Sequence, residues 1–191
     1  MVLQVWIFNS NMATFIMLPD GDVISEWDAS GGGTASYTDV DDDNGDTQYA
    51  FSNTTAERLQ VTLAAPSVAE ADIDMSAGIT VTIKASASKT LTGNSFVDFY
   101  QLGTAADSSV ISNGYDRITV VSGGFATYSG TAETTSDGSD DWVYGDLAGL
   151  QIRLVKFRND RFGQLRISYL YAEVDYTAAV TDNATFFGAN F

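Results

Sequence analysis

Carboxylates dominate the side chains of this sequence that could do chemistry. The chain has 20 Asp and 5 Glu among its 191 residues, and it has no His and no Cys. Without imidazole or thiol groups it cannot form a Ser–His–Asp or Cys–His nucleophile, a thiolate zinc site or a disulfide. Paired carboxylates can hydrolyse glycosidic bonds, but with so many carboxylates a close pair arises by chance. We therefore expect no catalytic residues and no enzyme activity.

One run of aspartates has the spacing of calcium ligands. Asp39, Asp41 and Asp43 alternate as in the start of an EF-hand loop, which needs Gly at its sixth position and Glu at its twelfth. Here those positions hold Asn44 and Ala50, so the EF-hand is excluded. Solvated turns are the favoured interpretation of the acidic loops, and we expect no metal and no cofactor. The alternative is another kind of calcium site, in the two loops formed by Asp41, Asp43 and Asp46, and by Asp137, Asp140 and Asp141.

The basic residues are few and unevenly placed. Five of the nine fall within fourteen positions, on one predicted hairpin: Arg153, Lys156, Arg158, Arg161 and Arg166. A positive spot on a negative body could orient docking on an acidic partner, whereas the alternative is a set of solvated strand positions that balance nearby Asp. The net charge of −16 opposes binding to nucleic acid or to anionic membranes.

The elements that position these groups are short strands. Alternating apolar and polar residues, bounded by Gly, Asn and Asp, predict strands, and a helical turn is indicated only over 72–76. This pattern favours an all-β fold, a two-sheet antiparallel β-sandwich of jelly-roll type, with a closed barrel as the alternative. The predicted strands cover 2–8, 12–18, 35–40, 47–51, 59–63, 79–84, 96–102, 117–121, 125–131, 150–157 and 165–176.

Both ends of the chain are apolar. No charged residue occurs in 1–18, but the first basic residue is Arg58 and a polar triplet interrupts the run at 9–11, which argues against a signal peptide or a membrane span. We expect residues 1–17 to form a hairpin that either joins the core or docks as an arm on a neighbouring subunit. An exposed aromatic tail over 178–191 would also need a surface to cover it. The candidate contact residues at the two ends are Val5, Trp6, Phe8, Phe15, Phe186, Phe187 and Phe191.

Three stretches between the ends carry a family resemblance. Residues 18–23 (LPDGDV) followed by Trp27, the aromatic and acidic stretch 37–48, and the closing segment 141–176 with its Trp142 resemble the β-sandwich domain of tailed-phage virion proteins of the capsid decoration, or cement, type. The resemblance covers about residues 18–177, the expected sandwich domain. It implies a non-enzymatic role on the virion capsid surface, the major capsid protein as partner, and a homotrimer.

The alternative function is a phage fibre or carbohydrate-binding β-sandwich module for host attachment. Such modules hold sugars against exposed aromatic faces. We favour core positions for the two tryptophans. The aromatic residues available to such a site are Trp27, Trp142, Tyr128, Tyr144, Tyr169 and Tyr171.

Overall fold

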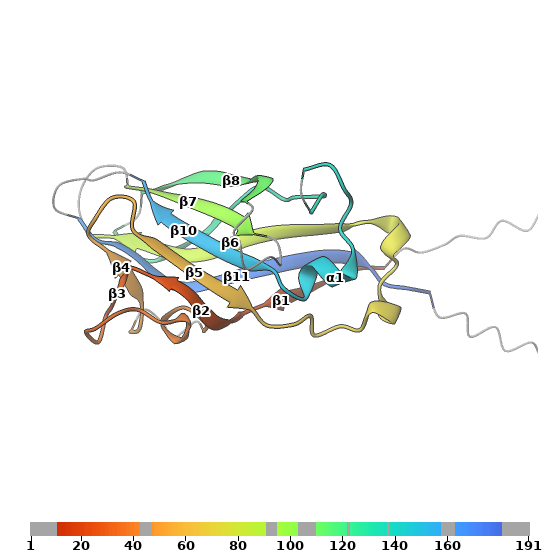
Figure 1. Ribbon diagram of the computed structural model, residues 1–191, viewed down its shortest axis with the longest axis horizontal. Coiled ribbons are helices and arrows are strands. Elements are labelled where there is room, and N and C mark those ends of the chain that lie inside the picture. The colour runs from red at the N-terminus through yellow and green to blue at the C-terminus, as the bar shows by residue number, and fades with distance from the viewer. Residues whose placement is uncertain are drawn as a thin grey trace, which may run out of the picture.

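The computed structural model describes residues 11–42, 47–90, 95–102, 110–121, 123–136, 138–157 and 163–180, with only the backbone for 95, 100–102 and 110–115. Eleven strands are formed within these ranges, and they run along the long axis of the molecule (Figure 1). In chain order the strands are β1 (Met12–Met17), β2 (Pro19–Ser25), β3 (Asp28–Ala29), β4 (Ala50–Ser52), β5 (Arg58–Leu63), β6 (Ile79–Lys89), β7 (Ser95–Leu102), β8 (Val110–Val120), β9 (Ala126–Ser129), β10 (Gln151–Lys156) and β11 (Leu165–Thr177).

The strands form two antiparallel sheets. The six-stranded sheet has the order β3-β4-β11-β6-β9, with β1 also paired to β11, and the five-stranded sheet has the order β2-β5-β10-β7-β8. Strand β11 is central in the larger sheet, because it pairs with β6 along one side and with β4 and then β1 along the other. The fold is therefore the expected two-sheet antiparallel sandwich of jelly-roll type.

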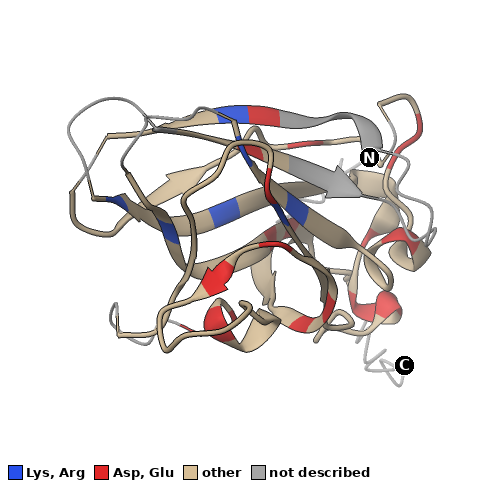
Figure 2. Cartoon of the chain, turned by 60° about the vertical axis from the view of Figure 1, so that its left-hand side comes forward, with Lys and Arg blue, Asp and Glu red and all other residues tan. Residues whose placement is uncertain are grey.

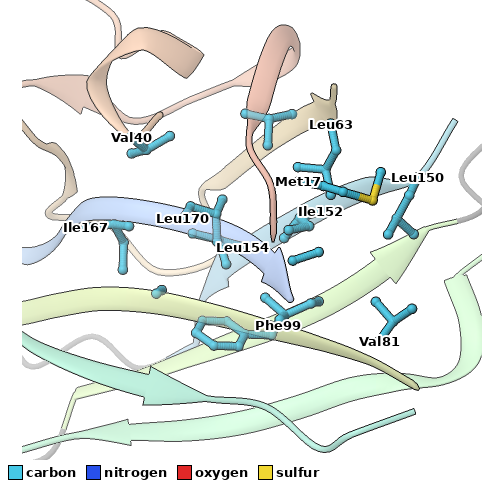
Figure 3. Packing of buried hydrophobic residues seen from close by; sticks show 14 of the residues in the cluster. Met17, Val40, Leu63, Val81, Phe99, Leu150, Ile152, Leu154, Ile167 and Leu170 are labelled. Carbon is cyan, nitrogen blue, oxygen red and sulfur yellow. The ribbon is translucent and has the colours of Figure 1, made fainter. Parts of the chain in front are cut away.

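The core lies between the two sheets. Alternate residues of β6, β10 and β11, such as Val81, Leu154 and Leu170, are fully buried, as a period of two along each strand requires. Figure 3 shows these side chains interleaved with Phe99 of β7 in the space between the sheets. Each fully buried side chain of this size stabilises the fold by about 1.5–3 kcal/mol.

Strand β1 is part of this sandwich. Phe15 and Met17 face the core, and Phe15 meets the ring of Tyr176 edge-on with 5.6 Å between ring centroids. Met12 and Ile16 face outward. The predicted strand at 12–18 is confirmed. Of the two alternatives for 1–17, joining the core holds for Met12–Met17, because these residues pair with β11 in register. The predicted strand over 2–8 lies outside the described residues.

Short helices replace some of the expected strand and loop. The segment 35–40, predicted as a strand, contains the 3-10 helix η1 (Tyr37–Asp39), and the expected turn near 72–76 is present as η2 (Glu70–Asp72) and η3 (Met75–Ala77). The sequence did not predict α1 (Tyr144–Leu147). In the part of the chain that the structure describes, no helix has the length and apolar character to span a bilayer.

Candidate functional site

The two ends of the described chain meet at one edge of the six-stranded sheet. The backbone N–H of Ala178 donates to the carbonyl of Asn11 over 3.0 Å, directly beyond the pairing of Met12 with Thr177. Residues 1–10 and 181–191 therefore continue the chain from adjacent points. Met12 and Val180 flank this junction and are 69% and 66% exposed. We call Met12 and Val180, with the Asn11–Ala178 junction, the terminal patch.

A hollow of about 340 Å³ lies beside the terminal patch. Met12, Met75 and Ile79 supply apolar surface, and the carboxylates of Asp141 and Asp175 supply polar surface. Asp175 accepts a hydrogen bond from the hydroxyl of Thr14, which fixes one of the two carboxylates against β1. The hollow thus offers mixed apolar and acidic surface where the ends of the chain leave the sandwich.

Most of the predicted contact residues belong to segments that the structure does not describe. Val5, Trp6, Phe8, Arg158, Arg161, Phe186, Phe187 and Phe191 lie outside the described residues. Among the rest, Phe15 is a core residue against Tyr176. Its predicted role as a surface contact is therefore wrong for the folded chain, because its ring is covered by its own domain.

The described members of the basic cluster point in different directions. On β10, Lys156 is 1% exposed, whereas Arg153 is half-buried on the opposite face of the same sheet, where it donates to Gln60 Oε1 over 2.8 Å. Arg166 lies on β11 of the other sheet, with its guanidinium 4.9 Å from the ring centroid of Tyr49. These three residues form no joint positive spot, and the predicted contact at Lys156 is wrong, because its side chain is enclosed in the core.

Aromatic rings gather on the outer face of the six-stranded sheet. Tyr169 and Tyr171 project outward from β11, with ring centroids 4.7 Å apart and planes inclined by 35°. Further along this face, Tyr49 lies 6.2 Å from Phe51 and 5.8 Å from Phe125, measured between ring centroids. We call these five aromatic residues, with Arg166, the aromatic face. The sequence named both β11 tyrosines as available aromatics but could not indicate that Tyr49, Phe51 and Phe125 join them.

The other predicted aromatic positions serve the fold. Trp27 and Trp142 are buried, and their indole N–H groups donate to the carbonyls of Glu57 (3.0 Å) and Glu133 (3.1 Å). Their assignment to the core is confirmed. Tyr144 donates to the carbonyl of Val68 over 2.7 Å. Tyr128 packs against the core cluster, so none of the four is a free sugar platform.

The acidic loops are held by hydrogen bonds. Asp39 is nearly buried and accepts bonds from the Ser36 backbone N–H (2.8 Å) and the Gln48 side chain (3.2 Å). Burial, followed by the neighbouring carboxylates of Asp42 and Asp39, raises the pKa of Asp41. No group of three or more carboxylates placed to hold a metal occurs among the residues that are described. Three of the suggested calcium ligands, Asp43, Asp46 and Asp137, lie outside them.

Comparisons with known proteins find similar solved structures but no related sequences. No protein-family model and no curated protein matches the chain. Among solved structures it is similar to the CBM36-1 domain of a multidomain xylanase from the hindgut metagenome of Trinervitermes trinervoides, with 11% identity and a TM-score of 0.42 over 89% of this chain and 100% of that chain. It is also similar to a CBM4 structure, with 15% identity and a TM-score of 0.35 over 80% and 92% of the two chains. At these identities the likeness concerns architecture alone.

Proposed function

We propose that this chain is a non-enzymatic structural protein of a tailed-phage virion, a decoration protein that binds the major capsid protein and stabilises the head. The observation that carries the proposal is the hydrogen bond between Ala178 and Asn11. It brings the starting points of both apolar end segments, 1–10 and 181–191, to one edge of a rigid sandwich. That edge also exposes Met12 and Val180, so apolar contact surface is present where both end segments begin.

Multiple weak attachments suit a protein that stabilises a shell. If each copy grips its neighbours through two apolar segments, a trimer has six such points, and the effective concentration created by the first contact strengthens the others. No catalytic turnover is needed for this role. The sandwich fixes the spacing of the attachment points, because its core is closely packed between two sheets.

The charge distribution fits dense display on a shell. Figure 2 shows acidic residues mainly in loops and short helices, and basic residues on strands. With a net charge of −16, the acidic loops limit non-specific adhesion between neighbouring copies and to polyanions. Attachment then depends on the apolar terminal patch, and the acidic loops keep the remaining surface from adhering.

A co-sedimentation assay tests the proposal. Capsids of the encoding virus, assembled without this protein, are mixed with the full-length chain, with the Met12→Asp variant, or with the Phe186→Ala/Phe187→Ala/Phe191→Ala variant. We expect the wild type to sediment with the shells and each variant to bind at least tenfold more weakly. Val121→Asp is the matched control, since Val121 is 63% exposed after β8 of the other sheet, and it should bind like the wild type.

Two outcomes would contradict the proposal. One is a wild-type chain that shows no affinity for the shells and remains a 20.4 kDa monomer in light scattering, since a trimer is expected in solution or on the shell. The other is equal weakening by Met12→Asp and Val121→Asp, which would mean that any added surface charge disturbs binding and that the terminal patch has no special part.

A further inference from the structure

Tyr169 and Tyr171 are partly exposed on the outer side of the six-stranded sheet, away from its core. They alternate along β11 with Leu170 and Ala172, which are fully buried, so the two tyrosine rings stand on the outer side of the sheet. With centroids 4.7 Å apart and planes inclined by 35°, the two rings stack against each other, and their partly exposed outer surfaces form one apolar patch. Aromatic surface of this kind is suited to the apolar C–H face of a ligand.

Hydrogen-bonding groups border the two tyrosine rings on the β6 side. In the sheet register Lys84 lies opposite Tyr171, and Ser86 lies opposite Tyr169. On the next strand, β9, Ser129 pairs with Lys84 and Thr127 with Ser86, and both β9 residues are exposed. Side-chain hydroxyls and an ammonium group therefore stand one or two strand spacings, about 5–10 Å, from the rings. A ligand with an apolar face and a rim of hydroxyl groups would satisfy both kinds of surface.

The aromatic face continues toward the other end of β11. Arg166 lies opposite Phe51 in the sheet register and covers the ring of Tyr49, which in turn contacts Phe125. Arg166 and Tyr171 lie opposite Ser88 and Lys84 of β6, four positions apart, which corresponds to about 13 Å of strand at the usual rise per residue. The face is thus long enough for several sugar rings in a row.

The charges on this face favour a neutral ligand. Lys84 forms an ion pair with Glu173, and Arg166 is engaged with Tyr49 and with the side-chain oxygen of Gln164. The net charge of −16 repels an anionic polymer. We propose that the aromatic face binds a neutral oligosaccharide of several pyranose units, stacked on Tyr169 and Tyr171 and hydrogen-bonded by Lys84, Ser86 and the hydroxyls of β9. This is a second activity, on a surface distinct from the terminal patch.

Titration of the full-length chain with oligosaccharides tests this site. The probes are cellohexaose, xylohexaose, laminarihexaose and maltohexaose, with a hyaluronan hexasaccharide as the acidic comparison, measured by calorimetry. We expect at least one neutral hexasaccharide to bind, with affinity reduced at least tenfold in Tyr169→Ala/Tyr171→Ala and changed less than threefold in Tyr169→Phe/Tyr171→Phe, which keeps the rings. Phe157→Ala is the matched control, because Phe157 is an exposed ring that follows β10 of the other sheet.

A second measurement on the wild type removes any dependence on how the alanine variant folds. In NMR titrations, backbone shifts caused by the bound hexasaccharide should map to β6, β9 and β11. Absence of binding by every neutral probe at millimolar concentration overturns the proposal. So does binding of hyaluronan alone, shifts confined to the five-stranded sheet, or an equal loss of affinity in Phe157→Ala.

Discussion

The ammonium group of Lys156 on β10 donates a hydrogen bond to the backbone carbonyl of Ser52 on β4, 3.0 Å away, and so links the two sheets through the core. It donates a second bond, also of 3.0 Å, to the carbonyl of Gly163, just before β11. The side chain is 1% exposed. A buried lysine of this kind stabilises the sandwich by donating hydrogen bonds to backbone carbonyls that have no water around them.

Replacing Lys156 tests how much this link contributes. Lys156→Ala removes the packed stem and leaves two carbonyls without their donor, so we expect a loss of about 3–5 kcal/mol in the free energy of unfolding. Lys156→Met keeps most of the volume and should lose about 1–3 kcal/mol. Urea denaturation measures both values. A methionine variant as stable as the wild type would show that burying the ammonium group costs as much as its hydrogen bonds return.

Neighbouring residues Phe15 and Ile16 lie on opposite faces of β1, one in the core and one at the surface. Phe15→Ala opens a cavity beside Tyr176 and should destabilise the fold by about 3–5 kcal/mol, because its ring lies in the core. Ile16 is 44% exposed, so Ile16→Ala should change stability by no more than about 0.5 kcal/mol. Thermal unfolding of the two variants is the measurement. Similar small effects for both would mean that β1 is not an integral strand of the sandwich.

Strand alternation made much of the fold predictable. The alternating apolar residues of 79–84 and 165–176 led to β6 and β11, and the sandwich class followed from the number of such strands. Strand β8 was predicted only over 117–121 but begins at Val110. Its Asn113–Gly114 dipeptide is typical of a turn, and it falls in the register shift between the pairs Tyr100–Tyr115 and Leu102–Val110 of the β7–β8 ladder. The turn preference of this dipeptide therefore coincides with an irregularity inside the strand, whereas the sequence pattern predicts the strand only after it.

Hydrogen bonds from side chains account for another difference. The segment 35–40 has the apolar and polar alternation of a strand, but Asp22 accepts the backbone N–H of Tyr37 and Asp39 accepts that of Ser36. These bonds take up donors that a sheet ladder would use, and the chain turns into a 3-10 helix. The partner Asp22 lies fifteen residues away from Tyr37, so local propensity could not reveal it.

The candidate site was less predictable than the fold. Arg153, Lys156 and Arg166 are close in sequence, but the face on which a strand residue stands depends on register, and the sheet to which each strand belongs depends on topology. The chain crosses from one sheet to the other between β10 and β11, which separates Arg166 from the other two. The aromatic face shows the converse, because the fold brings Tyr49 and Phe125 close to β11 although both are distant from it in sequence.

Arg117 joins a buried carboxylate to an exposed ring on the five-stranded sheet. Its guanidinium donates to both carboxylate oxygens of Asp98, which is 2% exposed, and lies 3.3 Å from the ring centroid of Phe157. We expect a double-mutant cycle of Arg117→Ala and Phe157→Ala to give a coupling of about 0.5–1 kcal/mol. Asp98→Ala should destabilise more than Phe157→Ala, because it removes the carboxylate that pairs with the guanidinium. A coupling near zero would show that the ring and the guanidinium act independently.

Glu133 and Glu26 should give opposite dependences of stability on pH. Burial, with a smaller contribution from the charge of Asp116, raises the pKa of Glu133, so ionisation of this group opposes folding. The resulting loss of folding stability is absent below the pKa that Glu133 has in the unfolded chain. It is complete above the raised pKa of Glu133 in the folded chain. Glu133→Gln should therefore raise the melting temperature at pH 7 and leave it unchanged at pH 3.

Glu26 provides the matched comparison for this pH series. The guanidinium of Arg58, which forms an ion pair with it, lowers the pKa of Glu26. The ionised Glu26 carboxylate therefore stabilises the folded state. This stabilisation is complete above the pKa that Glu26 has in the unfolded chain, and it is lost as the pH falls through the lowered pKa of Glu26 in the folded chain. Because both partners are substantially exposed, Glu26→Gln should cost only about 0.2–1 kcal/mol at pH 7, and nothing once the carboxyl is protonated. Melting curves of Glu133→Gln and Glu26→Gln between pH 3 and pH 7 measure both effects. If both substitutions changed the melting temperature in the same direction at pH 7, burial of Glu133 would not be the source of its penalty.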